Sequence, residues 1–160
     1  MLVFDASSMI YAWDNYPSSQ LPGLWKWMAT QVEQEDIVLP TIAFEQVVNK
    51  APDCGEWLKA NNLVRLEITN AILQDAMRIK GLIGVVDDNY HSKGVDESDL
   101  LIIAVARAHN VELVSNEEKQ ISLPIVLSKY KIPAVCDMNG VAVPCINFLE
   151  YIKRSQEVFG

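Results

Sequence analysis

Hydrophobic and polar positions along the chain form blocks that predict strands and helices in turn. Short apolar runs bounded by polar or turn residues predict buried strands at 2–4, 37–40, 111–116 and 144–147, with a strand or an extended connection at 64–68. Apolar residues at helical spacing predict helices at 7–16, 24–35, 41–50, 54–62, 70–83, 98–110 and 148–159. Because strands alternate with helices and no tight hairpin joins neighbouring strands, the pattern predicts a parallel sheet.

We therefore expect one α/β domain over residues 1–160, built as a three-layer α/β/α sandwich around a parallel sheet of four or five strands. Half of the residues are hydrophobic, which is ample for a single core. Ser7 or Ser8 is expected to cap the first helix, and Ser98 the helix at 98–110. Residues 132–143 are expected to form loop and turn, whereas 117–131 fits no clear pattern.

Four carboxylates stand where strands end or helices begin. Asp5 follows the first apolar run directly, Glu45 lies in the first turns of the helix after the second strand, Asp99 opens the apolar helix and Glu117 follows the next strand. A charge at a core edge costs several kcal/mol unless something compensates it. Because the carboxyl ends of parallel strands share one edge of the sheet, we expect the four to converge.

A hard divalent cation would relieve the repulsion among these acids. Mg²⁺ and Mn²⁺ prefer oxygen ligands and keep several waters, and they can activate water for phosphodiester hydrolysis. Each acid also has a simpler interpretation. Asp99 and Glu45 suit helix N-termini, and Glu117 has a charged neighbour in Glu118. Asp96 lies three residues before Asp99 and is a second candidate for the same place.

Composition restricts the chemistry further. Three widely spaced cysteines form no CxxC pair, and with two histidines a zinc site or a Ser-His triad is not expected. The net charge of −8 argues against a broad basic face for nucleic acid. RNA would then need a small local patch, for which the candidates are Lys93, Lys129, Lys131, Lys153 and Arg154, with stacking on Trp13 or Tyr90.

Two segments resemble PIN-domain ribonucleases, including VapC-type toxins. MLVFDASSMI matches their opening strand, acid and small hydroxyl residue, here Asp5 and Ser7. SDLLIIAVARAHNVELVSNE resembles their second signature, with Asp99, Ser115 and Glu117 in order, and Glu45 matches the family's acid in the helix after the second strand. The tail KIPAVCDMNGVAVPCINFLEYIKR resembles that of a largely uncharacterised prokaryotic PIN-like subset.

The resemblance implies a Mg²⁺- or Mn²⁺-dependent endoribonuclease, the toxin of a type II toxin–antitoxin pair. Asp5, Glu45, Asp99 and Glu117 would bind the metal, with Ser7, Ser115, Asn116 and Asp96 in support. Glu117 departs from the family's usual Asp, and Asn116 is an alternative donor beside it. The alternative is a non-catalytic PIN-like module that binds a partner through the acidic pocket. A phosphatase of the haloacid dehalogenase type is disfavoured because DAS lacks the second Asp of DxD.

The expected partners are RNA, a cognate antitoxin with a basic segment, which the resemblance and the acidic charge both imply, and a second copy of the chain. The dimer rests on the apolar content of the helix at 24–32, which could instead cover the sheet. No apolar stretch reaches the roughly 18–20 residues that span a bilayer. The N-terminus also lacks the basic region of a signal peptide, so a cytoplasmic protein is expected.

Overall fold

A parallel sheet of five strands forms the centre of the molecule. The computed structural model describes all of residues 1–160. The strands are β1 (Leu2–Phe4), β2 (Ile37–Pro40), β3 (Arg65–Leu66), β4 (Leu113–Val114) and β5 (Cys145–Ile146). Their order is β3-β2-β1-β4-β5, and every pair is parallel. The expected α/β fold is confirmed, and the weak strand at 64–68 is the edge strand β3.

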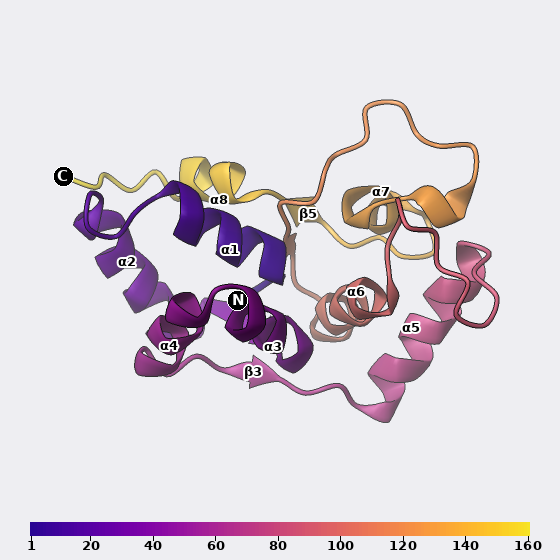
Figure 1. The fold of residues 1–160 in the computed structure, drawn as a ribbon, viewed down its shortest axis with the longest axis horizontal. Coiled ribbons are helices and arrows are strands. Elements are labelled where there is room, and N and C mark those ends of the chain that lie inside the picture. The colour runs from indigo at the N-terminus through magenta and orange to yellow at the C-terminus, as the bar shows by residue number, and fades with distance from the viewer.

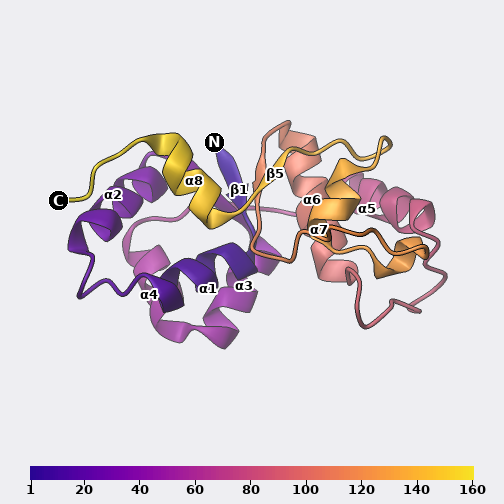
Figure 2. The ribbon, with the colours of Figure 1, turned by 90° about the horizontal axis from the view of Figure 1, so that it is seen from above.

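Eight α-helices surround the sheet, and Figure 1 shows their arrangement. They are α1 (Ala6–Asn15), α2 (Pro22–Glu33), α3 (Thr41–Lys50), α4 (Pro52–Ala60), α5 (Asn70–Leu82), α6 (Glu97–His109), α7 (Ile132–Asp137) and α8 (Phe148–Ser155), with a 3₁₀ turn η1 at Leu127–Lys129. Helices α1 to α4 and α8 gather at one end of the molecule and α5 to α7 at the other, with β1 and β5 between them (Figure 2).

One hydrophobic core of 40 buried residues runs through both groups of helices. Strand β2 is buried along its whole length, which explains why its sequence is apolar without alternation. Helix α6 is buried at every position from Leu100 to Ala106 and contacts α3, α5, α7 and β1. A helix packed on several sides needs apolar residues all round, and this is the reason for its long apolar run.

Three local expectations were wrong. Residues 132–137 form the short helix α7, whereas loop and turn were expected, and α7 has Pro133 in its first turn. Helix α4 begins at Pro52, two residues before the expected start at 54, because proline suits the first turn of a helix. The caps are Asp5 for α1 and Asp96 for α6, in place of the serines. Asp5 and Asp96, which were both expected to belong to the functional site, therefore also cap helices.

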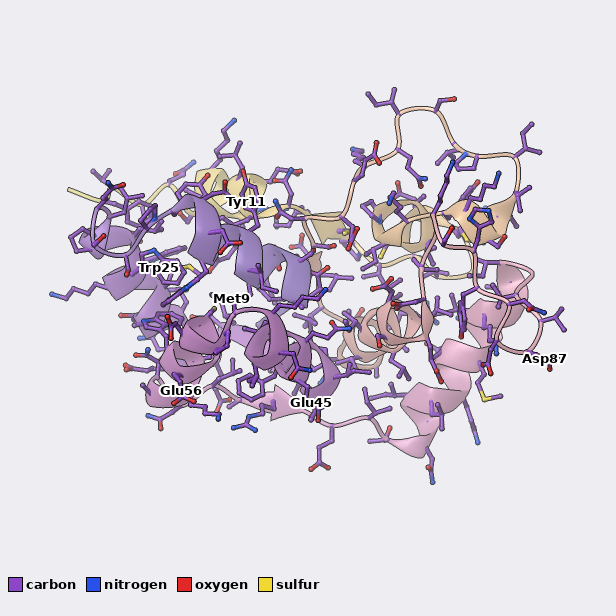
Figure 3. The ribbon with its side chains drawn as sticks, in the orientation of Figure 1. Met9, Tyr11, Trp25, Glu45, Glu56 and Asp87 are labelled. Carbon is purple, nitrogen blue, oxygen red and sulfur yellow. The ribbon has the colours of Figure 1, made fainter.

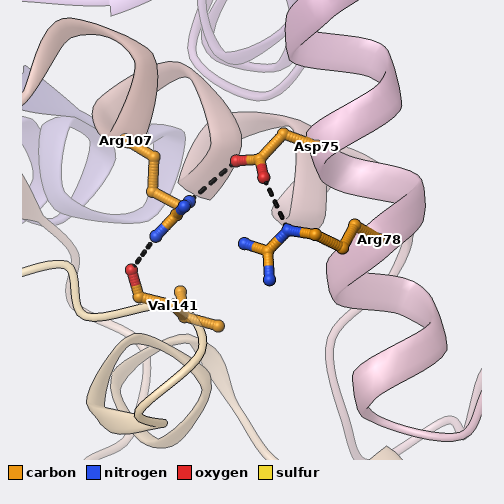
Figure 4. Close-up of polar contacts among 4 residues, drawn as sticks. All are labelled: Asp75, Arg78, Arg107 and Val141. Carbon is orange, nitrogen blue, oxygen red and sulfur yellow. Dashed lines mark hydrogen bonds and ion pairs between the residues drawn. The ribbon is translucent and has the colours of Figure 1, made fainter.

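A partly exposed ion pair joins α5 to α6 (Figure 4). The Asp75 carboxylate accepts from Arg107 Nε at 2.7 Å and from Arg78 Nε at 2.9 Å. Arg107 also donates to the Val141 carbonyl, in the turn that follows α7. These contacts hold the pKa of Asp75 below its usual value, although burial alone would raise it. The network joins three segments at the α5–α7 end and gives α6 a fixed position.

The apolar face of α2 packs inside its own chain. Leu24, Trp25, Met28 and Val32 are buried, and Trp27 stacks near Tyr151 and Phe159. The surface on which the expected homodimer rested is therefore already covered. None of the helices has the length and apolar character that crossing a membrane would need.

Candidate active site

Asp5 is a nearly fully buried carboxylate at the carboxyl end of β1. Only 2% of the residue is exposed, and its Oδ1 accepts from the Ser8 amide at 2.8 Å, which caps α1. Because β4 lies beside β1, Ser115 reaches Asp5 and donates to Oδ2 at 2.5 Å. Ser7 donates to the same carboxylate. Burial raises the pKa of Asp5 even though these hydrogen bonds lower it.

Asp96 and Asp99 form a reciprocal capping box at the start of α6. The Asp96 side chain accepts from the Asp99 amide at 2.9 Å, and the Asp99 side chain accepts from the Asp96 amide at 3.0 Å. The second acid expected three residues before Asp99 is thus part of the same small structure. Each carboxylate uses one oxygen for the cap, so the other oxygen is free to face the pocket.

Four carboxylates line a single pocket of about 290 Å³ at this edge of the sheet. They are Asp5, Asp96, Asp99 and Glu117, and Ser7, Gln46 and Lys50 line it too. Burial raises the pKa of Asp99 to about 7, with further increases from the negative charges of Asp96, Glu117 and Asp5. The hydrogen bond from the Asp96 amide works in the opposite direction. The acids therefore repel one another, as parallel-sheet geometry led us to expect.

Glu45 does not join them, and its expected convergence on Asp5 is wrong. Glu45 is exposed and lines a separate depression with Phe44, Lys59 and Arg65. Figure 3 shows Glu45 beside β3. Gln46, the next residue of α3, lines the acidic pocket instead, together with Lys50 one turn later. One residue turns a helix by about 100°, so a shift of one position moves a side chain to another face.

The supporting residues hold the loop after β4 in place. The backbone N–H of Asn116 donates to Ser7 Oγ at 3.0 Å, and the backbone N–H of Glu117 donates to Ser115 Oγ at 3.2 Å. The Asn116 side chain turns away from the acids and accepts from the Phe148 amide, at the start of α8. Ser7 and Ser115 are therefore well placed to orient Asp5, whereas Asn116 anchors α8.

The donor set fits a hard divalent cation. The pocket offers carboxylate and hydroxyl oxygens, the ligand type that Mg²⁺ and Mn²⁺ prefer. Burial is the main cause of the raised pKa of Asp99, and the neighbouring negative charges raise this pKa further. No three acids, histidines or cysteines stand together in ligand geometry. Ion binding would thus require some of these side chains to rotate. They have room to do so, because Asp96 is exposed and Asp99 and Glu117 are only half-buried.

Comparisons with known proteins agree with this architecture. The family model described as Domain of unknown function (DUF4411) matches residues 2–159. The chain superposes with a TM-score of 0.55 on a chain of the crystal structure of VapBC2 from Rickettsia felis, which was solved bound to a DNA fragment from the VapBC2 promoter. The two sequences are 16% identical over 91% of this chain and 97% of that one. No curated protein matches significantly. The structural likeness shows a PIN-like fold.

Proposed function

We propose that this chain, which belongs to the DUF4411 family, is a metal-dependent endoribonuclease. The observation that carries the proposal is the meeting of Asp5, Asp96, Asp99 and Glu117 in one pocket of a PIN-like fold. They come from three places in the chain. Helix capping explains the positions of Asp5, Asp96 and Asp99 one by one, but it does not explain why all four acids meet. Such an arrangement is costly without a ligand, which makes the pocket a candidate functional site.

Asp5, Asp99 and Glu117 would hold Mg²⁺ or Mn²⁺, with Asp96 beside them. When bound, the ion supplies a Lewis acid for the phosphodiester and lowers the pKa of water. Ser7, Ser8 and Ser115 fix the Asp5 carboxylate through hydrogen bonds, so its orientation is set before any ligand arrives. Lys50 is the one cation that lines the pocket, and it is free to contact a phosphate oxygen.

The test is cleavage of single-stranded and structured RNA with Mg²⁺ or Mn²⁺, compared with EDTA. Asp5→Asn keeps the shape of the side chain and removes its charge, and we expect cleavage to fall by a few powers of ten. Asp14→Asn is the matched control, because Asp14 is an exposed acid on α1 outside the pocket. Equal cleavage by both variants would contradict the proposal and indicate a contaminating nuclease.

We further propose that the enzyme is a toxin restrained by a partner with a basic segment. A second depression lies next to the pocket and shares Glu117 with it. Its acids are Glu117, Glu118, Asp137 and Glu150, against the single cation Lys119. Arginine or lysine side chains would find complementary charge there. The VapBC2 structure is itself a complex, which makes an antitoxin the natural class of partner.

A non-catalytic binding module is the alternative, and one observation favours it. Gln46 occupies the α3 position of the pocket, so the acid expected from that helix is missing. Peptide binding and RNA cleavage, both measured in Asp5→Asn, distinguish the two proposed functions. A binding module would keep its affinity for a basic peptide in Asp5→Asn and would cleave no RNA with any divalent ion. An endoribonuclease would lose cleavage in the same variant.

A further inference from the structure

We infer that the depression around Arg65, on the far side of α3 from the acidic pocket, is a subsite for a backbone phosphate of the RNA. Thr41, Phe44, Glu45, Val48, Asn49, Lys59 and Arg65 line it. This inference rests on the proposed function, because it names how the substrate of that pocket is held. The expected cation patch of Lys93, Lys129, Lys131, Lys153 and Arg154 includes none of these residues.

Arg65 lies over an aromatic ring, and its side-chain hydrogen-bond donors are unused within the chain. Its guanidinium lies over the ring of Phe44, with 4.1 Å between the Cζ atom and the ring centroid. Phe44 is only 4% exposed, so the ring is a firm support. Arg65 itself is exposed, and its side chain forms no ion pair or hydrogen bond within the chain. A guanidinium that contacts an aromatic ring and has no partner within the chain keeps its N–H groups available to phosphate oxygens.

The charges in the depression leave a small positive excess. Lys59 lies over the same Phe44 ring at 5.9 Å and makes only a loose ion pair with Glu56, at 3.5 Å. Glu45 is the one acid in the lining, against Lys59 and Arg65. Asn49 adds an exposed amide. In a chain of net charge −8, two cations on one aromatic ring beside an acidic pocket are an unusual arrangement that favours an anionic ligand.

The path between the two sites follows α3. Gln46 and Lys50, one turn apart, line the acidic pocket, and Glu45 and Asn49, also one turn apart, line the depression. The two sites lie on different faces of this one helix, and about the 10 Å width of a helix separates them. One RNA strand could therefore place one phosphate among the acids, pass Lys50, and place a nearby phosphate on Arg65.

The test measures binding of a fluorescein-labelled single-stranded RNA by anisotropy in Ca²⁺, with the RNA checked for integrity on a gel. Arg65→Gln should weaken binding about fivefold and reduce the slope of log affinity against log salt by about 0.7, the value for one lost single-strand phosphate contact. Lys26→Gln, an exposed cation on α2, is the matched control and should change neither quantity. Glu45→Gln should strengthen binding, because it removes the one acid in the lining of the depression.

The outcomes separate this subsite from the proposed function. An unchanged salt slope in Arg65→Gln, with Asp5-dependent cleavage present, would overturn the subsite and leave the nuclease standing. A reduced slope without any cleavage would support the subsite and contradict the nuclease. If Arg65→Gln instead lost affinity for polyglutamate and kept its affinity for RNA, the depression would be a surface for an acidic protein segment, and the subsite would be wrong.

Discussion

Asp99 is the residue through which pH acts on the acidic pocket. Its pKa is raised to about 7, from an unfolded-state value near 3.9. Between these pH values the folded protein holds a proton that the unfolded chain has released. The contribution of Asp99 to stability is therefore fully present below about pH 4 and is lost as pH rises through 7.

The prediction is that Asp99→Asn removes this dependence. In EDTA, the wild type should lose stability relative to Asp99→Asn as the pH rises from 4.5 to 7.5. The slope of this loss against pH should correspond to nearly one more proton bound in the folded state than in the unfolded state. Urea unfolding at several pH values measures it. Comparing the two proteins cancels groups such as Asp75, whose lowered pKa acts in the opposite direction. A constant difference between the two proteins across this range would show that Asp99 is ionised throughout.

The pocket could be anticipated residue by residue only in part. Asp5 was recognisable because a carboxylate directly follows buried apolar positions, and sheet geometry then brought Asp99 and Glu117 to it. Glu45 was misplaced because a strand end fixes where a helix begins but not which face of the helix turns inward. The signal that was available is Val47, which is buried beside Gln46 and orients α3.

Among the elements, the start of α6 has two roles that one substitution can separate. Asp96 caps the helix and also adds negative charge beside Asp99. Asp96→Asn keeps a capping oxygen and removes the charge, whereas Asp96→Ala removes both. We expect the Asn variant to be more stable than the Ala variant by about 1 kcal/mol, the usual value of a cap. Without metal, it should also match or exceed the wild type.

Urea unfolding of the three proteins in EDTA measures the difference. The relief of charge offsets part of the lost cap in Asp96→Ala, so that variant should lose less than a cap normally contributes. If the Asn and Ala variants were equally stable, the Asp96 side chain would contribute no capping energy in solution.

The loop before α6 depends on a glycine for a close approach. A Cβ added to Gly94 would lie 1.9 Å from the Ser128 carbonyl oxygen, in η1, and the Val95 amide donates to the Tyr130 carbonyl next to it. Gly94→Ala should therefore force the two segments apart and destabilise the protein by about 2 kcal/mol or more, in the range of overpacked sites. Denaturant unfolding measures the change.

Gly81→Ala is the control for this substitution. Gly81 lies in α5, and a Cβ there meets nothing within 4 Å. Alanine at that position should be neutral or stabilise the helix by up to about 1 kcal/mol. Equal effects of the two alanines would mean that the contact between Gly94 and η1 does not persist in solution.

Hydrophobic periodicity along the sequence failed to predict an element that is too short to show a period. Helix α7 has six residues and a proline in its first turn, so it is too short for a helical period to be distinguished from a loop. It is held by tertiary contacts with α6 and β5. Longer elements such as α5 and α6 were predictable because their apolar faces repeat over several turns.

For the whole molecule, net charge and the pocket act together. A chain of net charge −8 concentrates four of its acids in one pocket, so a divalent ion should stabilise the folded state much more than the unfolded one. At a concentration of 100 times its dissociation constant, a ligand adds about 2.7 kcal/mol. For a domain of this size, that corresponds to a rise in Tm of about 5–10 °C.

This prediction separates specific binding from general screening of negative charge. Mg²⁺ or Mn²⁺ at pH 7.5 should raise the Tm of the wild type by that amount, measured by calorimetry against EDTA. Asp5→Asn and Glu45→Gln each remove one negative charge, but only Asp5 lies in the acidic pocket. The metal-induced rise should therefore be largely lost in Asp5→Asn and retained in Glu45→Gln. An equal rise in both variants would mean that the ions act on the overall charge, and the pocket would then not be a metal site.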